Sequence, residues 1–234
     1  MRKAIRQPLI TQRNFGLYDS RENGSRSDLL EIIAKSLKVT YSQRIEYNRR
    51  DAILFFATTV ILFKNNRDIA DYLNKRLDHS WIDNFSVLGD GVVDYSLCII
   101  GRQWGDERTR ETADLGLAAL ISAGVAAQLV KHLLGVPRPA DTVGEPRVTG
   151  PSWKYDSFPS GHTTNVFALA TVIAEKYPNS KWLSYTIASL VGISRITRGA
   201  HWPADVFAGA GLGILFGRHV LNNRGQILTN RNAP

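Results

Sequence analysis

Six segments of the chain carry apolar side chains at helical spacing, and they constrain the fold more than any other feature. Five are uncharged apolar runs, and the sixth is weaker because it contains Asp90 and Asp94. Alternating patterns typical of strands are sparse. We therefore predict an all-α fold, a bundle of six helices. The segments are residues 52–63, 86–100, 115–130, 163–174, 182–194 and 206–217.

The lengths of these runs bear on whether the helices cross a membrane. A spanning helix needs about 20 mostly apolar residues, and none of the runs reaches 18. The mean hydropathy of −0.16 is also low for a multi-pass protein. However, the runs are rich in Gly, Ala, Ser and Thr, which let membrane helices approach closely. Flanking Arg, Lys, Trp and Tyr can extend them to the interfaces. A membrane-embedded bundle and a soluble one both stay open.

The two ends of the chain differ from this helical region. Residues 1–27 are polar with little periodicity and predict a mobile N-terminal arm without the apolar stretch of a secretory signal. In residues 28–50, the stretch "DLLEIIAKSL" predicts a short amphipathic helix that packs on the domain or lies on a membrane surface. The helical domain then covers residues 51–221, and an Asn-rich tail covers residues 222–234.

The charge balance limits the kinds of partner. The chain carries 29 Lys and Arg against 21 Asp and Glu, a formal net charge of +8. Such a surplus favours phosphorylated ligands, nucleic acid or an acidic membrane surface. We expect no nucleic-acid partner, because neither stacking aromatics nor a basic recognition helix is evident. A single cysteine, Cys98, excludes an internal disulfide.

The helix predicted at residues 163–174 has an unusual start, "PSGH". Ser160 suits an N-cap. Gly161 weakens a helix, and His162 gains nothing from an apolar neighbourhood. A helix start favours an anion, because its free amides and the positive end of its dipole face the ligand. We interpret the stretch as a phosphate site, in which Gly161 lets the backbone approach, Ser160 donates a hydrogen bond and His162 protonates a leaving oxygen.

A second reactive group follows in "SRITRGAHWPAD". His201 and Asp205 are four residues apart, and Pro203 marks the first turn of a helix. This spacing lets the carboxylate hold one ring nitrogen and leaves the other free as a nucleophile. Taken alone, the pair equally fits an ordinary surface contact. Three cations would complete a phosphate pocket if the segments meet: Lys131, Arg138 and Arg195.

Together these residues form an ordered pattern that resembles the type 2 phosphatidic acid phosphatase (PAP2) superfamily, which is shared with bacterial acid phosphatases and vanadium haloperoxidases. The family pattern is K-x6-R-P, then P-S-G-H, then S-R-x5-H-x3-D. Its three parts begin here at Lys131, Pro159 and Ser194, and all eleven defining residues are present at the family's spacings. The resemblance covers residues 115–220.

The resemblance implies a metal-independent phosphatase of the PAP2 six-helix type. His201 would attack phosphorus and form a phosphohistidine, Asp205 would orient it, and His162 would protonate the leaving group. No metal and no other cofactor is implied. The residues implied to hold the phosphoryl oxygens are Lys131, Arg138, Ser160, Gly161 and Arg195.

Several functions share such a pocket. We favour a phosphatase acting on a lipid phosphate or diphosphate, such as phosphatidate, phosphatidylglycerophosphate or a polyprenyl diphosphate. A vanadate-dependent haloperoxidase, in which His201 would coordinate vanadate, is an alternative, although those chains are generally longer. A soluble, non-specific acid phosphatase and a non-enzymatic phosphate-binding or lipid-surface protein are the others.

Topology offers a consistency test. If the six helices span a membrane and the N-terminus is cytoplasmic, Lys131, His162 and His201 all fall on the extracytoplasmic side. The cytoplasmic connections then carry many Arg and Lys, as the positive-inside tendency requires. We therefore expect a multi-pass protein of the cell membrane with membrane lipids as partners, and keep a soluble or peripheral protein as the alternative.

Overall fold

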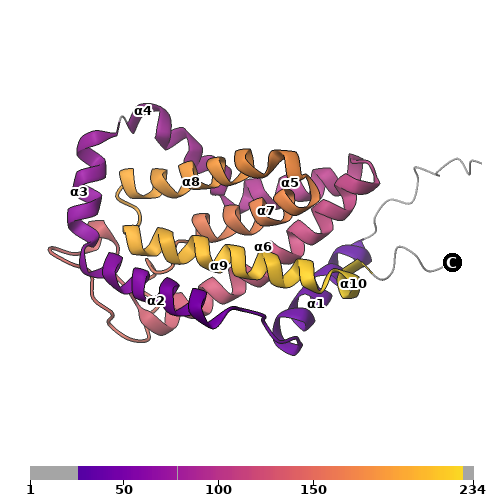
Figure 1. The fold of residues 1–234 in the computed structure, drawn as a ribbon, viewed down its shortest axis with the longest axis horizontal. Coiled ribbons are helices and arrows are strands. Elements are labelled where there is room, and N and C mark those ends of the chain that lie inside the picture. The colour runs from indigo at the N-terminus through magenta and orange to yellow at the C-terminus, as the bar shows by residue number, and fades with distance from the viewer. Residues whose placement is uncertain (1–25, 78, 229–234) are drawn as a thin grey trace, which may run out of the picture.

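The computed structural model describes residues 26–77 and 79–228, and these residues form helices and connecting loops without a strand (Figure 1). This confirms the all-α prediction. The α-helices are α1 (Arg26–Ser42), α2 (Arg49–Lys64), α3 (Asn66–Arg76), α4 (His79–Ile82), α5 (Gly91–Trp104), α6 (Glu107–Leu134), α7 (Gly161–Lys176), α8 (Lys181–Thr197), α9 (Pro203–Asn222) and α10 (Arg224–Leu228). Three short 3-10 helices lie in the connections: η1 (Asp83–Gly89), η2 (Pro139–Asp141) and η3 (Pro178–Ser180).

Each of the six predicted segments lies on a helix, namely α2 and α5 to α9. The weaker segment is divided, because η1 precedes α5. The described residues also contain α3, α4 and α10, which the apolar pattern did not predict. The predicted amphipathic helix is longer than expected, since α1 begins within the predicted arm, whose first 25 residues lie outside the described part. α10 occupies part of the predicted C-terminal tail.

The core lies where α6 packs against α7 and α9 (Figure 1). Its fully buried side chains include Leu115 and Ala119 of α6, Ala168 and Val172 of α7, and Val220 of α9. α1 packs on the same cluster through Val39. The amphipathic N-terminal helix therefore covers the helical domain, as the packing alternative predicted.

Glycines bring α9 unusually close to α7. A Cβ atom at Gly213 would lie 2.4 Å from the carbonyl oxygen of Thr164, and one at Gly209 would lie 2.7 Å from that of Ser160. Gly217 continues the same stripe one turn further along. Small residues at this spacing allow two helix backbones to touch. The contact therefore fixes the start of α9 against the start of α7.

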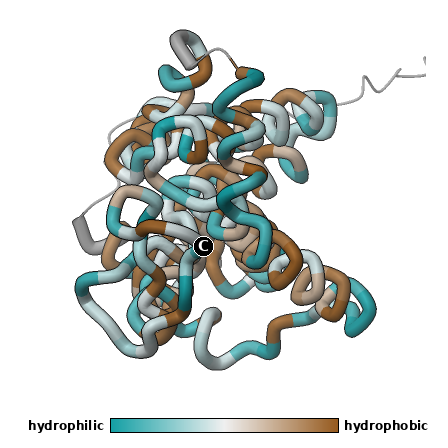
Figure 2. Tube along the Cα trace, turned by 90° about the vertical axis from the view of Figure 1, so that its left-hand side faces the viewer, coloured by the Kyte–Doolittle hydropathy of each residue, from teal (hydrophilic) through white to brown (hydrophobic). Residues whose placement is uncertain are grey.

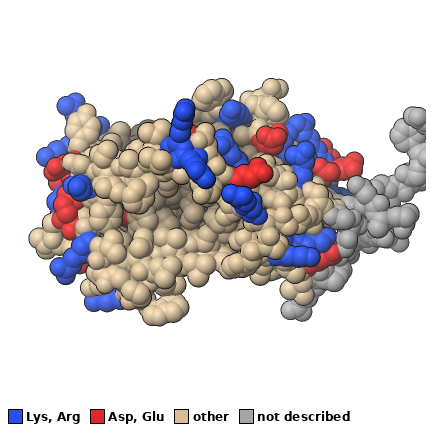
Figure 3. All heavy atoms as spheres, turned by 60° about the horizontal axis from the view of Figure 1, so that its bottom comes forward, with Lys and Arg blue, Asp and Glu red and all other residues tan. Residues whose placement is uncertain are grey.

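Large apolar side chains remain exposed along the sides of the molecule. α2 has no buried residue, and its Ile53, Leu54 and Phe56 are each at least 65% exposed. Figure 3 shows the resulting broad surface without charged groups. Hydrophobic stretches recur along the helices, whereas the loops at the end shown in Figure 2 are mostly hydrophilic or neutral. Exposed apolar areas of this extent mark contact with lipid or protein.

Within the described residues, two helical segments, those containing α6 and α9, are long and apolar enough to cross a membrane. The most apolar stretch of the segment that contains α6 is 61% buried inside the protein, and that of α9 is 56% buried. Each could therefore serve as a core helix and as a span.

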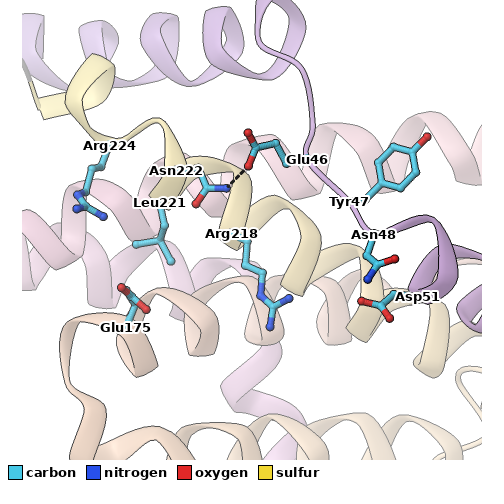
Figure 4. A pocket seen from close by; sticks show the side chains of 9 residues that line it. All are labelled: Glu46, Tyr47, Asn48, Asp51, Glu175, Arg218, Leu221, Asn222 and Arg224. Atoms are coloured by element: carbon cyan, nitrogen blue, oxygen red, sulfur yellow. Dashed lines mark hydrogen bonds between the residues drawn. The ribbon is translucent and has the colours of Figure 1, made fainter.

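A cavity of about 590 Å³ lies at the end of α7 that carries Glu175, opposite the end that carries His162. Its lining charges have both signs, and Arg218 extends between Glu175 and Asp51 (Figure 4). The sixteen residues of α7 make a helix about 24 Å long. The cavity is therefore separate from the predicted phosphate site.

Candidate active site

The three motif segments meet at one end of the bundle. Here α6 and α8 end and α7 and α9 begin, on the left of Figure 1. The backbone amide of Ser160 donates a 2.9 Å hydrogen bond to the carbonyl oxygen of Asp205, which ties the start of α7 to the start of α9. The backbone amide of His201 donates to the carbonyl oxygen of Arg195 at 3.1 Å. The second and third motifs therefore form one unit.

His201 and Asp205 are buried side by side. Their side chains are 3% and 0% exposed, and Nδ1 of His201 lies 3.5 Å from Oδ2 of Asp205. The same oxygen accepts hydrogen bonds from the Trp202 amide at 2.9 Å and from the Ser157 hydroxyl at 2.5 Å. A separation of 3.5 Å is long, but catalytic hydrogen bonds are often long before substrate binds. The arrangement turns Nδ1 toward the carboxylate, which leaves Nε2 for chemistry.

Burial lowers the pKa of His201 below the ordinary histidine value, although the contact with Asp205 opposes the shift. Desolvation penalises the charged imidazolium, so the neutral ring is favoured. A neutral ring that keeps its proton on Nδ1 has a lone pair on Nε2. Burial therefore favours the form of His201 that has a free lone pair on Nε2.

Lys131 and Arg138 converge on one residue that the sequence pattern did not include. The Lys131 ammonium donates to the backbone carbonyl of Asp156. Arg138 forms a fork with the Asp156 carboxylate, with Nε to Oδ1 and the terminal nitrogen to Oδ2 both at 3.0 Å. Burial raises the pKa of Asp156, but the Arg138 hydrogen bond and the Lys131 charge outweigh it, so the pKa lies below its usual range.

Ser160 is the N-cap of α7. The Ser160 oxygen accepts hydrogen bonds from the Thr163 amide at 3.5 Å and the Thr163 hydroxyl at 3.0 Å. Both bonds use oxygen lone pairs, so the Ser160 proton is left for a ligand. The Lys131 side chain reaches over Gly161, with its Cε 4.0 Å from where a Cβ would stand. His162 is partly exposed next to Gly161, on the same helix start.

Arg195 comes from the last turn of α8. One terminal nitrogen donates to the Ser86 hydroxyl, and its Nε is buried without a partner in the described structure. A buried guanidinium N–H without an acceptor is costly unless a ligand supplies one. Arg195 therefore has a donor available for an anion.

A model of the PAP2 superfamily matches residues 113–227, the stretch that contains all three motifs. This stretch of the chain belongs to the PAP2 superfamily. Relatives include a lipid A 1-phosphatase of Porphyromonas gingivalis, 29% identical over 82% of this chain and 42% of that protein. An undecaprenyl-diphosphatase of Sulfolobus acidocaldarius is 32% identical over 46% of this chain and 52% of its own length. The chain thus spans well under two thirds of these relatives.

Solved structures of the superfamily share the fold. LpxE of Aquifex aeolicus matches with a TM-score of 0.52 and 28% identity over 67% of this chain and 94% of that one. A transmembrane PAP2-type phosphatidylglycerolphosphate phosphatase of Bacillus subtilis matches with a TM-score of 0.53 over 84% and 95% of the two chains, at 20% identity. Both likenesses concern the fold.

Residues before the PAP2 match also support the site. The Asn66 side-chain oxygen accepts a 2.9 Å hydrogen bond from the Ala204 amide, in the first turn of α9. The Arg67 guanidinium lies 5.5 Å from the centre of the Trp202 ring and donates to the Gly144 carbonyl at 2.7 Å. No motif marks these residues. Asp156 and Ser157 had the one available signal, because they lie three and two residues before the start of the second motif.

Proposed function

We propose that this PAP2 protein is a metal-independent membrane phosphatase that hydrolyses a phosphomonoester or diphosphate of a lipid through a phosphohistidine at His201. The observation that carries the proposal is the buried His201–Asp205 pair at the start of α9, hydrogen-bonded through the backbone to the start of α7. Donors for an anion surround it on Lys131 and Arg195.

In the first step, Nε2 of His201 attacks phosphorus and the bond to the leaving oxygen breaks. The ring then carries a positive charge, which the Asp205 carboxylate stabilises at Nδ1. The phosphoryl dianion favours the protonated form of His162, which gives its proton to the leaving oxygen. Lys131, Arg138 and Arg195 hold the equatorial oxygens.

In the second step, water replaces the leaving group. His162, now neutral, takes a proton from the water as it attacks phosphorus. The bond between phosphorus and Nε2 breaks, and inorganic phosphate is released. The Ser160 hydroxyl and the Gly161 amide hold the phosphoryl oxygens in both steps, because they are fixed at the start of α7.

The lipid character of the substrate is supported by the relatives and by the exposed surface. The relatives are named for lipid A, for undecaprenyl diphosphate and, in Mycobacterium tuberculosis, for decaprenylphosphoryl-5-phosphoribose. All three names describe a lipid that carries phosphate. The exposed apolar side chains of α2 and α5 provide a surface on which such a group can remain in lipid.

We infer a multi-pass topology in which α2 and α5 to α9 cross the membrane and the site lies on the extracytoplasmic side. The start of α2 then lies in the cytoplasm, and the ends that carry the three motifs share the opposite face. Cys98 is the only cysteine, so a Cys98→Ala background allows labelling with a membrane-impermeant maleimide. Lys154→Cys should react in intact cells and Arg108→Cys only after lysis.

The enzymatic test is phosphate release from lipid and soluble phosphoesters in detergent with EDTA, comparing the parent with His201→Ala. We expect release from lipid substrates that EDTA does not affect and that the substitution abolishes. Release that survives His201→Ala, or that EDTA removes, would contradict the proposal. Release from soluble esters alone would instead indicate an acid phosphatase, and no release from any ester would remove the enzyme assignment.

A further inference from the structure

One edge of the Arg138 guanidinium, formed by Nε and one terminal nitrogen, is already occupied. Two nitrogens of Arg138 bind the two oxygens of the Asp156 carboxylate at 3.0 Å each. The Lys131 ammonium binds the backbone carbonyl of the same residue. One aspartate therefore engages two of the three cations that the sequence pattern assigns to phosphate.

A carboxylate and a phosphoryl group present the same pattern to a guanidinium. Each offers two oxygens that accept parallel N–H bonds from the planar fork. The two anions therefore compete for the same nitrogens of Arg138. By contrast, the buried Nε of Arg195 has no acceptor in the described structure and stays open to a ligand.

The position of Asp156 allows it to leave. The side chains of Arg138 and Asp156 are 36% and 41% exposed, whereas Lys131, His201 and Asp205 are nearly fully buried. Asp156 therefore lies on the open side of the pocket and can turn into water without burying its charge. An ion pair exposed to this degree contributes little stability, so an incoming dianion can displace the carboxylate.

We propose that Asp156 occupies the phosphate subsite of the free protein and is displaced when a phosphoryl group binds. The inference rests on the proposed function, because it assigns Arg138 to the phosphoryl oxygens. The carboxylate lowers the affinity for substrate and for inorganic phosphate by the same factor. It also returns to Arg138 as phosphate leaves, which assists product release.

The test is calorimetric titration of inorganic phosphate into the purified full chain, comparing the parent with Asp156→Asn. We expect the variant to bind phosphate roughly two- to fivefold more tightly, as an exposed ion pair permits. In turnover, KM for a lipid substrate should fall by the same factor. Asp156→Ala should shift phosphate binding in the same direction, which guards against an effect of the new amide.

Asp141→Asn is the matched control. Asp141 lies in η2 and acts on Arg138 through its charge, without a hydrogen bond to the guanidinium among the described contacts. Phosphate binding in this variant should change less than in Asp156→Asn. Equal gains in both variants would reduce the effect to general charge and overturn the inference.

Unchanged or weaker phosphate binding in Asp156→Asn would also overturn it, since Asp156 would then hold Arg138 in place for the ligand. Titration needs no turnover, so the two proposals can fail separately. A chain that hydrolyses nothing but shows the expected shift loses the proposed function and keeps the displacement. A chain that hydrolyses lipid phosphate without the shift keeps the proposed function and loses the displacement.

Discussion

Gly213→Ala tests whether the close contact between α7 and α9 positions the active site. The added methyl would lie 2.4 Å from the Thr164 carbonyl oxygen and 2.8 Å from the Ala168 nitrogen, both backbone atoms. Restoring a separation of 3.0 Å requires the two helices to part by about 0.6 Å. Overpacking of this kind costs about 1–3 kcal/mol of stability. Misplacing catalytic groups by about 1 Å can lower the rate by about 10²-fold, so we expect kcat to fall about tenfold or more.

The assay measures kcat for phosphate release well below the thermal midpoint, together with Tm in the same detergent. Gly124→Ala in α6 is the control, because its nearest atom outside the helix is the Tyr95 hydroxyl at 3.9 Å, an ordinary contact. That variant should keep its kcat and gain up to about 1 kcal/mol from helix propensity. Parent-level kcat and Tm in Gly213→Ala would refute the idea that the contact sets the geometry.

Three further outcomes follow from the site. Ser157→Ala removes the 2.5 Å hydrogen bond to Asp205. A hydrogen bond to a charged group contributes about 1.5–3 kcal/mol, so kcat should fall about tenfold or more while KM stays nearly unchanged. A change of that size in KM with kcat unchanged would contradict this role. Asn66→Ala removes the acceptor for the Ala204 amide. The fold should lose about 0.5–2 kcal/mol of stability, measured as a lower Tm. An unchanged Tm would show that this hydrogen bond contributes nothing. Burial lowers the pKa of His201, so the neutral ring persists at acidic pH. The acid limb of kcat/KM should therefore lie below about pH 6.5, and a limb above that value would contradict the burial argument.

The predictable part of the site is the part that lies within single segments. His201 and Asp205 are four residues apart on one helix start, and Ser160 caps α7, so local geometry is enough to orient them. The pairing of Arg138 with Asp156 depends on how the loop after α6 folds back. The sequence gives no register for such a loop, and it could not be predicted.

The fold shows the same division. The six apolar helices could be predicted because burial and exposure to apolar surroundings both require apolar side chains. α3 has the sequence "NRDIADYLNKR" and was missed, because it is mostly polar and too short to contain an apolar run. α3 supports the site through Asn66 and Arg67, which contact Ala204 and Trp202 far along the chain.

The junction of α2 and α3 gives the site an order of assembly. During synthesis from the N-terminus, Asn66, Arg67 and Ser86 emerge before His162 and His201. Their partners Ala204, Trp202 and Arg195 come later in the chain. The two hydrogen bonds and the cation–π contact between Arg67 and Trp202 therefore form only once α8 and the start of α9 have formed. Under the proposed mechanism, a nascent chain that ends directly before His201 has the cations Lys131, Arg138 and Arg195 but no nucleophile. Hydrolysis would then begin only after α9 has docked.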